Sequence, residues 1–288
     1  FYFNSNMIEQ MEKIKSAYCY FYPLAQEPER KSRQLGHSMV AKDFKSLNPK
    51  ICAEKAIEKT QKHLNYKPIQ NGKYLTVFSG EAFLDLLNAF ANIFNAQNIL
   101  DAKSLLKKED LTTKIASQLI SIVDSPFHCE HISPLSFDEE GTATKEIEFI
   151  HQGFLKNLMQ SSVTAKHFQT EPTGHTTLGT KLTLSPHFLH VKSNTGEKRS
   201  LTQENKIVYV DNIFSLHAGV NALQGSFSLP FHGWLIENST FTSIEAATVA
   251  GDFLEVIRNI CYVDNIPHIL PHGVCPEVWI PELSITGL

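Results

Sequence analysis

The sequence predicts an α+β fold: a helix-containing α/β portion followed by a β-rich, barrel-like or sandwich-like domain. Residues 81–94 place apolar side chains at helical spacing and form the strongest helix pattern in the chain. Residues 227–236 alternate apolar and polar side chains, as strands with one buried face do. After residue 126 the composition shifts to Ser, Thr, Gly and Pro with short apolar runs. We therefore expect two domains, at 1–125 and 126–288.

The composition is that of a folded protein. The 288 residues suffice for one large core or two modest ones, and 42% are apolar and 19% charged. A net charge of −4 predicts no nucleic-acid partner, and no apolar run is long enough for a membrane helix. The odd number of scattered cysteines favours free thiols and a cytoplasmic location. They are Cys19, Cys52, Cys129, Cys261 and Cys275.

The first half alternates strand and helix patterns. Aromatic residues at 17–22 predict a strand, and Asn48 followed by Pro49 predicts a capped helix that ends near residue 64. A strand at 74–78 precedes the helix at 81–94. A β-branched run at 120–123 predicts a strand that leads into Asp124. The chain begins with Phe inside a strand-like stretch, so we expect the N-terminal portion to be incomplete.

Short strands and turns dominate the second half. Residues 146–150 and 154–155 flank a glycine turn and predict a hairpin, and 162–168 predict a short helix. Residues 173–182 are expected to be a loop. The stretch 219–260 then contains a turn, alternating strands and a final amphipathic helix, which together predict a strand–turn–strand–helix unit.

The stretch 219–260 also carries a family resemblance. Its motifs G-V-N-x-x-x-G-x-F-S, G-x-x-I-E-N and T-V-A-G-D-F-L-E-V-I-R-N-I resemble the closing domain of the TldD/PmbA family of peptidase subunits, once called modulators of DNA gyrase. Weaker matches at 137–144, 153–157, 164–166 and 172–175 follow in the family's order. His175 stands where relatives usually have Asn, and the role of residues 180–206, which are hard to match, is open.

The resemblance implies where a zinc site would lie. Zinc-bearing members carry H-E-x-x-x-H on a helix, with two imidazole ligands and a carboxylate that activates water. The matching positions here are Asn88, Ala89 and Ile93, none of which can play these roles. Cys275 resembles a cysteine ligand of those relatives but directly precedes the last strand, so we interpret that similarity as chance. The resemblance therefore implies a PmbA (TldE)-like subunit with no catalytic residue, no metal and no cofactor of its own.

The same resemblance implies a partner and a substrate class. Zinc is expected in a TldD-like partner subunit, in a heterodimer, although a homodimer is also compatible, and the substrates are expected to be short unfolded peptides. We expect peptide to add as a strand to an open sheet edge along 219–238. The candidate peptide-binding residues are Asn221, Gly225, Phe227, Ser228, Gly233, Trp234, Glu237 and Asn238.

Two alternatives stay open. Four potential ligands occur at 128–131, so His128, Cys129 and His131 could hold a transition metal and make the chain an independent metalloenzyme. Pro126 and Pro134 bracket this segment and instead favour an exposed linker. The second alternative is a non-enzymatic peptide-binding scaffold without a peptidase partner.

Overall fold

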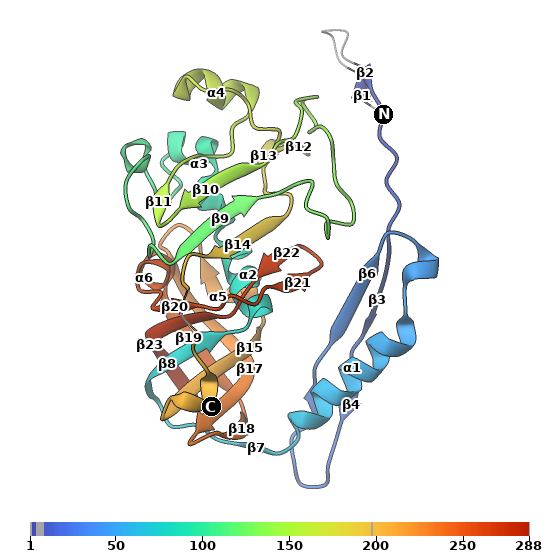
Figure 1. Ribbon diagram of the computed structural model, residues 1–288, viewed down its shortest axis with the longest axis vertical. Helices are drawn as coiled ribbons and strands as arrows, with labels where there is room; N and C mark the ends of the chain where they lie inside the picture. Colours follow the sequence, from blue (N-terminus) through green and yellow to red (C-terminus); the bar gives the residue numbers. More distant parts are fainter. Residues whose placement is uncertain (1, 4–8, 197, 288) are drawn as a thin grey trace.

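The computed structural model describes residues 2–3, 9–196 and 198–287. A closed five-stranded barrel forms the lower body of the molecule (Figure 1), with strand order β15-β8-β23-β19-β17 and a further pairing of β17 with β15 that closes it. Among the pairs that form the barrel, β8 and β15 pair parallel and the other pairs are antiparallel. The strands are β8 (Gly72–Phe78), β15 (Lys206–Ile213), β17 (Ser226–Glu237), β19 (Ala247–Asp252) and β23 (Val278–Gly287). The predicted α+β class with a β-rich later part is confirmed.

A six-stranded sheet lies above the barrel (Figure 1), in the order β11-β10-β9-β14-β22-β21. Its strand β9 lies between β10 and β14, and all of its residues are buried. Burial of both faces fits the adjacent apolar residues Ile122 and Val123, which break strict alternation. The strands are β9 (Ile120–Asp124), β10 (Ile147–His151), β11 (Phe154–Leu155), β14 (Leu189–Ser193), β21 (His268–Leu270) and β22 (Gly273–Cys275).

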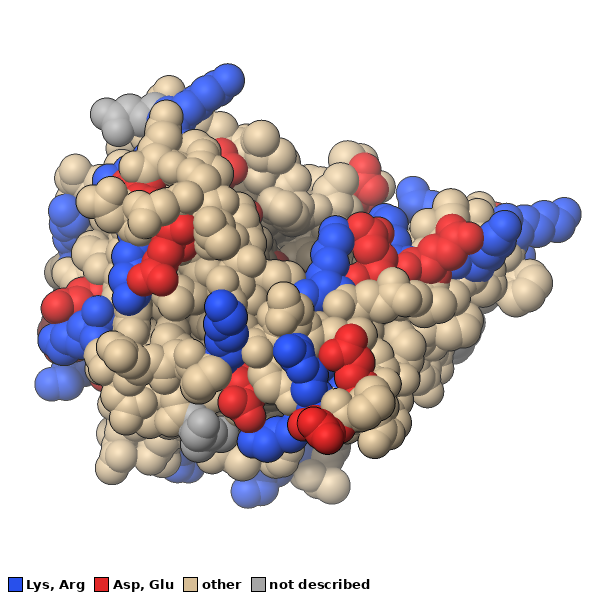
Figure 2. Space-filling view, turned by 90° about the horizontal axis from the view of Figure 1, so that it is seen from below, with Lys and Arg blue, Asp and Glu red and all other residues tan. Residues whose placement is uncertain are grey.

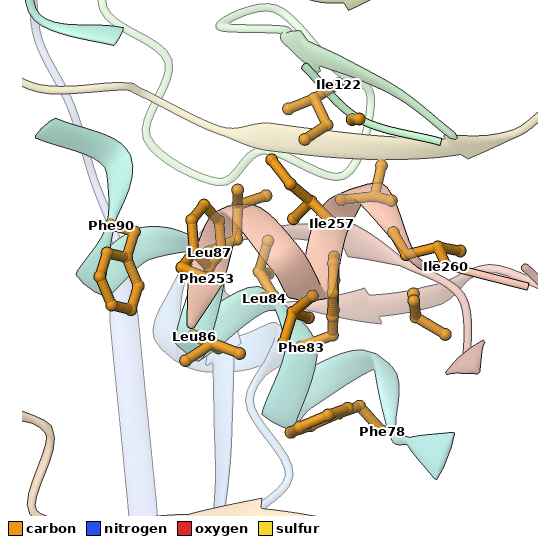
Figure 3. Packing of buried hydrophobic residues seen from close by; sticks show 14 of the residues in the cluster. Phe78, Phe83, Leu84, Leu86, Leu87, Phe90, Ile122, Phe253, Ile257 and Ile260 are labelled. Carbon is orange, nitrogen blue, oxygen red and sulfur yellow. The ribbon is translucent and has the colours of Figure 1, made fainter. Parts of the chain in front are cut away.

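Helix α2 (Gly80–Ala89) packs with α6 (Phe253–Arg258) in the core between these two sheets (Figure 3). The Ser79 hydroxyl caps α2 by accepting the Ala82 amide at 3.0 Å. The ring of Phe90, where α2 ends, stacks on Phe253 with centroids 4.4 Å apart. This central layer joins barrel and sheet into one hydrophobic core.

The helix expected at 81–94 is shorter than predicted. α2 ends at Ala89, and the chain continues as a 3₁₀ helix, η2 (Ala91–Phe94). Phe90 stacks on Phe253 of α6, whereas Phe94 stacks on Phe149 of β10 at 4.7 Å. Packing against two different elements turns the chain where helical periodicity alone predicts continuation.

Residues 17–67 form a separate layer beside the barrel (Figure 1). Strands β3 (Ala17–Phe21) and β6 (His37–Ala41) pair antiparallel and carry α1 (Pro49–Lys62), which begins at the predicted Asn48 cap. Strand β7 (Tyr66–Lys67) then pairs with β18 (Thr240–Ile244), which extends the barrel sheet. The layer is therefore tied to the body through main-chain pairing.

Strand pairing crosses the domain boundary expected near residue 125. Strand β8 lies inside the barrel between β15 and β23, and β9 lies inside the six-stranded sheet. Residues 72–124 thus belong with the later part, because their partners in both sheets come from beyond residue 146. Residues 173–182, expected to be a loop, contain most of a small hairpin.

The bounds of the other strands and helices are as follows. Strands are β1 (Tyr2–Phe3), β2 (Glu9–Gln10), β4 (Leu24–Ala25), β5 (Arg33–Gln34), β12 (Thr176–Leu178), β13 (Leu182–Leu184), β16 (Val220–Asn221) and β20 (Tyr262–Val263). Helices are α3 (Ala96–Leu100), α4 (Ser162–Phe168), α5 (Leu216–Gly219), η1 (Phe44–Ser46), η3 (Lys108–Asp110) and η4 (Leu201–Gln203). No helix in the described ranges is long and apolar enough to cross a membrane.

Replacing Phe90 by Ala should strongly destabilise the fold. The ring is fully buried and stacks on Phe253, so its removal leaves a cavity between the two sheets and should cost about 3–5 kcal/mol. Chemical denaturation followed by circular dichroism measures the shift. The control is Phe44→Ala, whose ring is 79% exposed and should leave the transition unchanged. A Phe90→Ala transition close to that of the unmodified protein would contradict this account of the core.

Candidate functional site

The positions implied for a zinc motif lie at the C-terminal end of α2. Asn88 and Ala89 line a pocket of ≈ 450 Å³ together with Asp85, His187 and His272. Ile93 does not reach this pocket, because its side chain is 2% exposed and belongs to the hydrophobic core. An amide, a methyl group and a buried alkyl chain do not fit a hydrolytic zinc ion, which needs imidazole or carboxylate ligands and a general base.

The pocket beside α2 has polar groups of a different kind. His272 Nε2 lies 3.1 Å from Asp85 Oδ1, yet this nitrogen is buried without a well-directed hydrogen bond. Asp85, His187 and His272 do not converge closely enough to form a ligand set among the described residues.

A buried cluster of one carboxylate and two imidazoles lies at the end of β9. His175 Nε2 is 2.9 Å from Asp124 Oδ2, and neither side chain has any exposed surface. The other carboxylate oxygen, Oδ1, accepts the amides of His187 at 3.0 Å and Phe188 at 2.7 Å. One ligand atom from each of Asp124, His175 and His187 lies within 4.8 Å of the others. Within the described ranges, this is the one such group of three or more His, Cys, Asp or Glu residues.

Electrostatic interactions keep the Asp124 carboxylate of this cluster ionised. Burial opposes the charge of Asp124, but the hydrogen bond from His175 and the amide of Phe188 help to hold its pKa below the usual value. Burial lowers the pKa of His187, which is therefore neutral at pH 7. Its Nε2 must donate to the Gly174 carbonyl at 2.6 Å, so the lone pair lies on Nδ1.

Sequence reasoning did not find this cluster. His175 stood out only as a departure from the family pattern, and nothing in the sequence singled out His187. The three residues come from β9, from the segment before β12 and from the loop before β14, separated by up to 63 positions. The residue that could have pointed to the cluster is Asp124, because it is a carboxylate at the end of a strand that is buried throughout.

The alternative ligands at 128–131 are not brought together. His131 Nδ1 donates to the Pro126 carbonyl at 2.6 Å, and its ring stacks on Phe188. Cys129 is exposed, with Sγ 4.0 Å from His128 Nδ1. The residues His128, Cys129 and His131 do not meet the spacing of a three-ligand cluster, which is found only around Asp124 in the part of the chain that the structure describes.

We expected a peptide to add as a strand to an open sheet edge along 219–238. This expectation is wrong for β17, which cannot accept a peptide by edge pairing. Its first half pairs with β19 and its second half with both β15 and β18. At the remaining gap, α5 covers the strand, and the Phe214 amide donates to the Pro230 carbonyl. A strand whose two edges are occupied has no free main-chain groups to offer.

The eight candidate residues along β17 also do not form one site. Asn221 and Glu237 lie near opposite ends of the 12-residue strand. Gly233 is required by packing, because a Cβ there would overlap the Tyr209 carbonyl oxygen. Gly225 has φ +79°, which the turn demands. Of the others, Phe227 is buried, Ser228 and Asn238 are exposed, and Trp234 lines a groove.

That groove runs between the N-terminal layer and the barrel. Two adjoining pockets of ≈ 280 and ≈ 300 Å³ form it, with His37 in both. The ring of His63 lies 4.4 Å from Trp234, and its Nε2 is 3.6 Å from Asp211 Oδ2. The residues that line it from α1, α2 and the barrel include Lys59, His63, Glu81, Asp85, Asp211, His232 and Trp234. Viewed from below, acidic and basic side chains are interspersed on this side of the molecule (Figure 2).

One chain of contacts has the residue types of a hydrolytic triad but not its function. It runs from Asp211 through His63 to Ser243. His63 Nδ1 is 3.0 Å from Ser243 Oγ, but Ser243 is 1% exposed and faces no pocket. A nucleophile must reach a substrate carbonyl. This chain of contacts therefore anchors α1 to the barrel.

These features define an α+β protein with a closed barrel, a core helix α2 beside a pocket, and a groove under an N-terminal layer. Comparison with known families makes the assignment specific. The family model described as the PmbA/TldA metallopeptidase C-terminal domain matches residues 71–287, and the chain belongs to this family.

Individual relatives agree. The metalloprotease PmbA homolog of Buchnera aphidicola is 21% identical over 285 residues, which are 98% of this chain and 62% of that protein. A putative modulator of a DNA gyrase from Thermotoga maritima is similar in structure, with TM-score 0.84 and 27% identity over 93% of this chain and 62% of the other. TldE from Thermococcus kodakarensis has the same fold, with TM-score 0.80 and 22% identity over 94% and 63%. The chain thus spans less than two thirds of the length of these relatives.

His232 in the groove should make stability depend on pH. Burial, reinforced by the positive charges of His63 and Arg33, lowers its pKa to about 4. Because the unfolded side chain titrates near 6.5, the unfolded chain takes up a proton between pH 6.5 and 4 that the folded chain does not. Folding stability should therefore fall over this range as the pH drops, by up to about 3 kcal/mol from this residue.

Comparison with His232→Gln tests this. The variant should lose less stability than the unmodified protein between pH 7 and pH 4.5, measured as the free energy of unfolding in urea at each pH. His167→Gln, at an exposed position, is the control and should follow the unmodified protein. Parallel curves for all three proteins would show that His232 is not the titrating group.

Proposed function

We propose that this chain is the part without the hydrolytic zinc of a two-subunit peptidase: a PmbA (TldE)-like subunit that completes the substrate chamber of a zinc-bearing TldD-type partner. This proposal rests on the pocket wall formed by Asn88 and Ala89, because neither side chain can serve as a ligand of a hydrolytic zinc ion or activate water. Family membership supports metallopeptidase chemistry for the assembly. A chain with this wall depends on a partner for the hydrolytic centre.

The groove under the N-terminal layer supports a role in holding peptide. It offers an aromatic face, Trp234, beside groups of both charge signs, Lys59 and Asp211. Such a surface suits an extended peptide that is recognised by its backbone and general shape rather than by one side chain. Among the residues first considered along β17, Trp234 supports this proposal because it lines the groove. Free cysteines in the described chain favour a cytoplasmic setting for the assembly.

Mixing with a TldD-type chain should reveal activity that neither chain has alone. An unfolded protein such as casein and short fluorogenic peptides are suitable substrates, and fragment release measures hydrolysis. The mixture should lose activity with a chelator and regain it with zinc, because the partner holds the ion. Chelator-sensitive hydrolysis by the purified chain alone would overturn the proposed subunit role, and a mixture without activity would favour the scaffold alternative.

Peptide binding in the groove should change tryptophan fluorescence. Of the two tryptophans, Trp279 is 1% exposed, so a response to peptide would come from Trp234. Titration with an unfolded peptide should shift the emission of the unmodified protein, and Trp234→Phe should abolish the shift. Trp234→Ala should weaken binding several-fold in a competition assay.

Hydrogen exchange provides the independent control. Peptide should protect amides of residues around the groove, whereas the far end of β17 near Asn221 serves as the internal reference. Protection that is unchanged at the groove in the presence of saturating peptide would remove this surface from the proposal.

A further inference from the structure

We propose that Asp124, His175 and His187 form a binding site for one divalent transition-metal ion of the zinc class, at the end of β9 and separate from the α2 positions. The three residues supply a carboxylate and two imidazoles, the ligand types that zinc takes from proteins. Their ligand atoms lie within 4.8 Å of one another, and an ion bound at 2.0–2.2 Å in a tetrahedral site would bring them to a spacing of about 3.4 Å.

The surroundings orient each group as outer partners orient metal ligands. The two backbone amides that bind Asp124 Oδ1 leave Oδ2 directed at His175 Nε2. On the opposite side of the ring, His175 Nδ1 is 2.8 Å from the Thr173 hydroxyl. Histidines that bind metals usually hold their second ring nitrogen in this way, which sets the tautomer and the direction of the ligating nitrogen.

His187 is the third proposed ligand, and an outer partner orients its ring as Thr173 orients that of His175. Its Nε2 donates to the Gly174 carbonyl, a typical outer partner of a metal-bound histidine, and its Nδ1 has no hydrogen-bond partner in the described part of the chain. The ring is half-buried and lines the pocket shared with Asn88 and Ala89. An ion and a solvent ligand can therefore enter from the pocket, although Asp124 and His175 are sealed.

Ligation of a metal by His175 Nε2 requires the ring to carry its hydrogen on Nδ1, where the Thr173 hydroxyl oxygen can accept it. A neutral ring only moves its hydrogen from Nε2 to Nδ1, whereas an imidazolium ring releases the Nε2 proton to solvent. The full burial of these two side chains gives the site a structural role. The ion would join the end of β9 to the segments before β12 and β14, which lie 51 and 63 positions further along the chain.

This inference is independent of the proposed subunit role, because it concerns metal held by the chain itself and needs no partner or substrate. The test uses the purified chain, stripped with chelator and then titrated with zinc chloride in a calorimeter. Bound metal is counted by elemental analysis after dialysis. The unmodified chain should bind one zinc ion, and zinc should raise its melting temperature.

Matched variants locate the ion. His175→Asn and His187→Gln should each weaken zinc binding by more than about tenfold, since even outer partners of metal ligands contribute that much. His190→Gln changes a neighbouring histidine on β14 outside the set and should bind zinc as the unmodified chain does. Circular dichroism of the metal-free proteins confirms that each is folded, and His187→Gln retains a donor for the Gly174 carbonyl if His175→Asn fails to fold.

Two results would overturn the site. The first is a folded, unmodified chain that retains no stoichiometric zinc and shows no thermal shift. The second is zinc binding that survives both His175→Asn and His187→Gln. If that binding is lost in Cys129→Ser, the ion belongs to the exposed segment at 128–131 instead.

Discussion

The parallel pairing of β8 with β15 inside the closed barrel is the constraint on which the rest of the structure depends. β8 leads directly into α2, and the end of β15 holds the start of that helix. The Ser79 amide donates to the Val210 carbonyl at 2.9 Å, and the Ser79 hydroxyl donates to the Asp211 carbonyl at 2.7 Å. The direction of α2 is therefore determined by the closing strands before any side chain of the helix packs.

This arrangement places the pocket and the groove on the same helix. The first turns of α2 contribute Glu81 and Asp85 to the groove, whereas its last turn contributes Asn88 and Ala89 to the pocket. Asp85 lies in both, because residues three or four apart share a face of a helix.

Asp124 organises the second sheet in a comparable way. Its carboxylate binds two loop amides and one imidazole, so it satisfies buried donors from two distant segments at once. Burying an unpaired carboxylate would be very costly, so these partners are required for the fold as well as for any ion that binds there. The groove differs, since Lys59 and Asp211 remain partly exposed and their ion pair is open to solvent.

The sequence alone determined the local elements and the chemistry that is absent. Alternation along β17, the Asn48 cap of α1 and the apolar run of β9 follow from periodicity and capping, and the side chains at 88, 89 and 93 are read directly. Only the tertiary structure decided that β17 has no free edge, that α2 stops at Ala89 and that residues 72–124 join the later part. It also brought Asp124, His175 and His187 together. The physical reason is that periodicity reports which face of an element is buried, whereas strand partners and side-chain clusters depend on contacts between residues far apart in the chain.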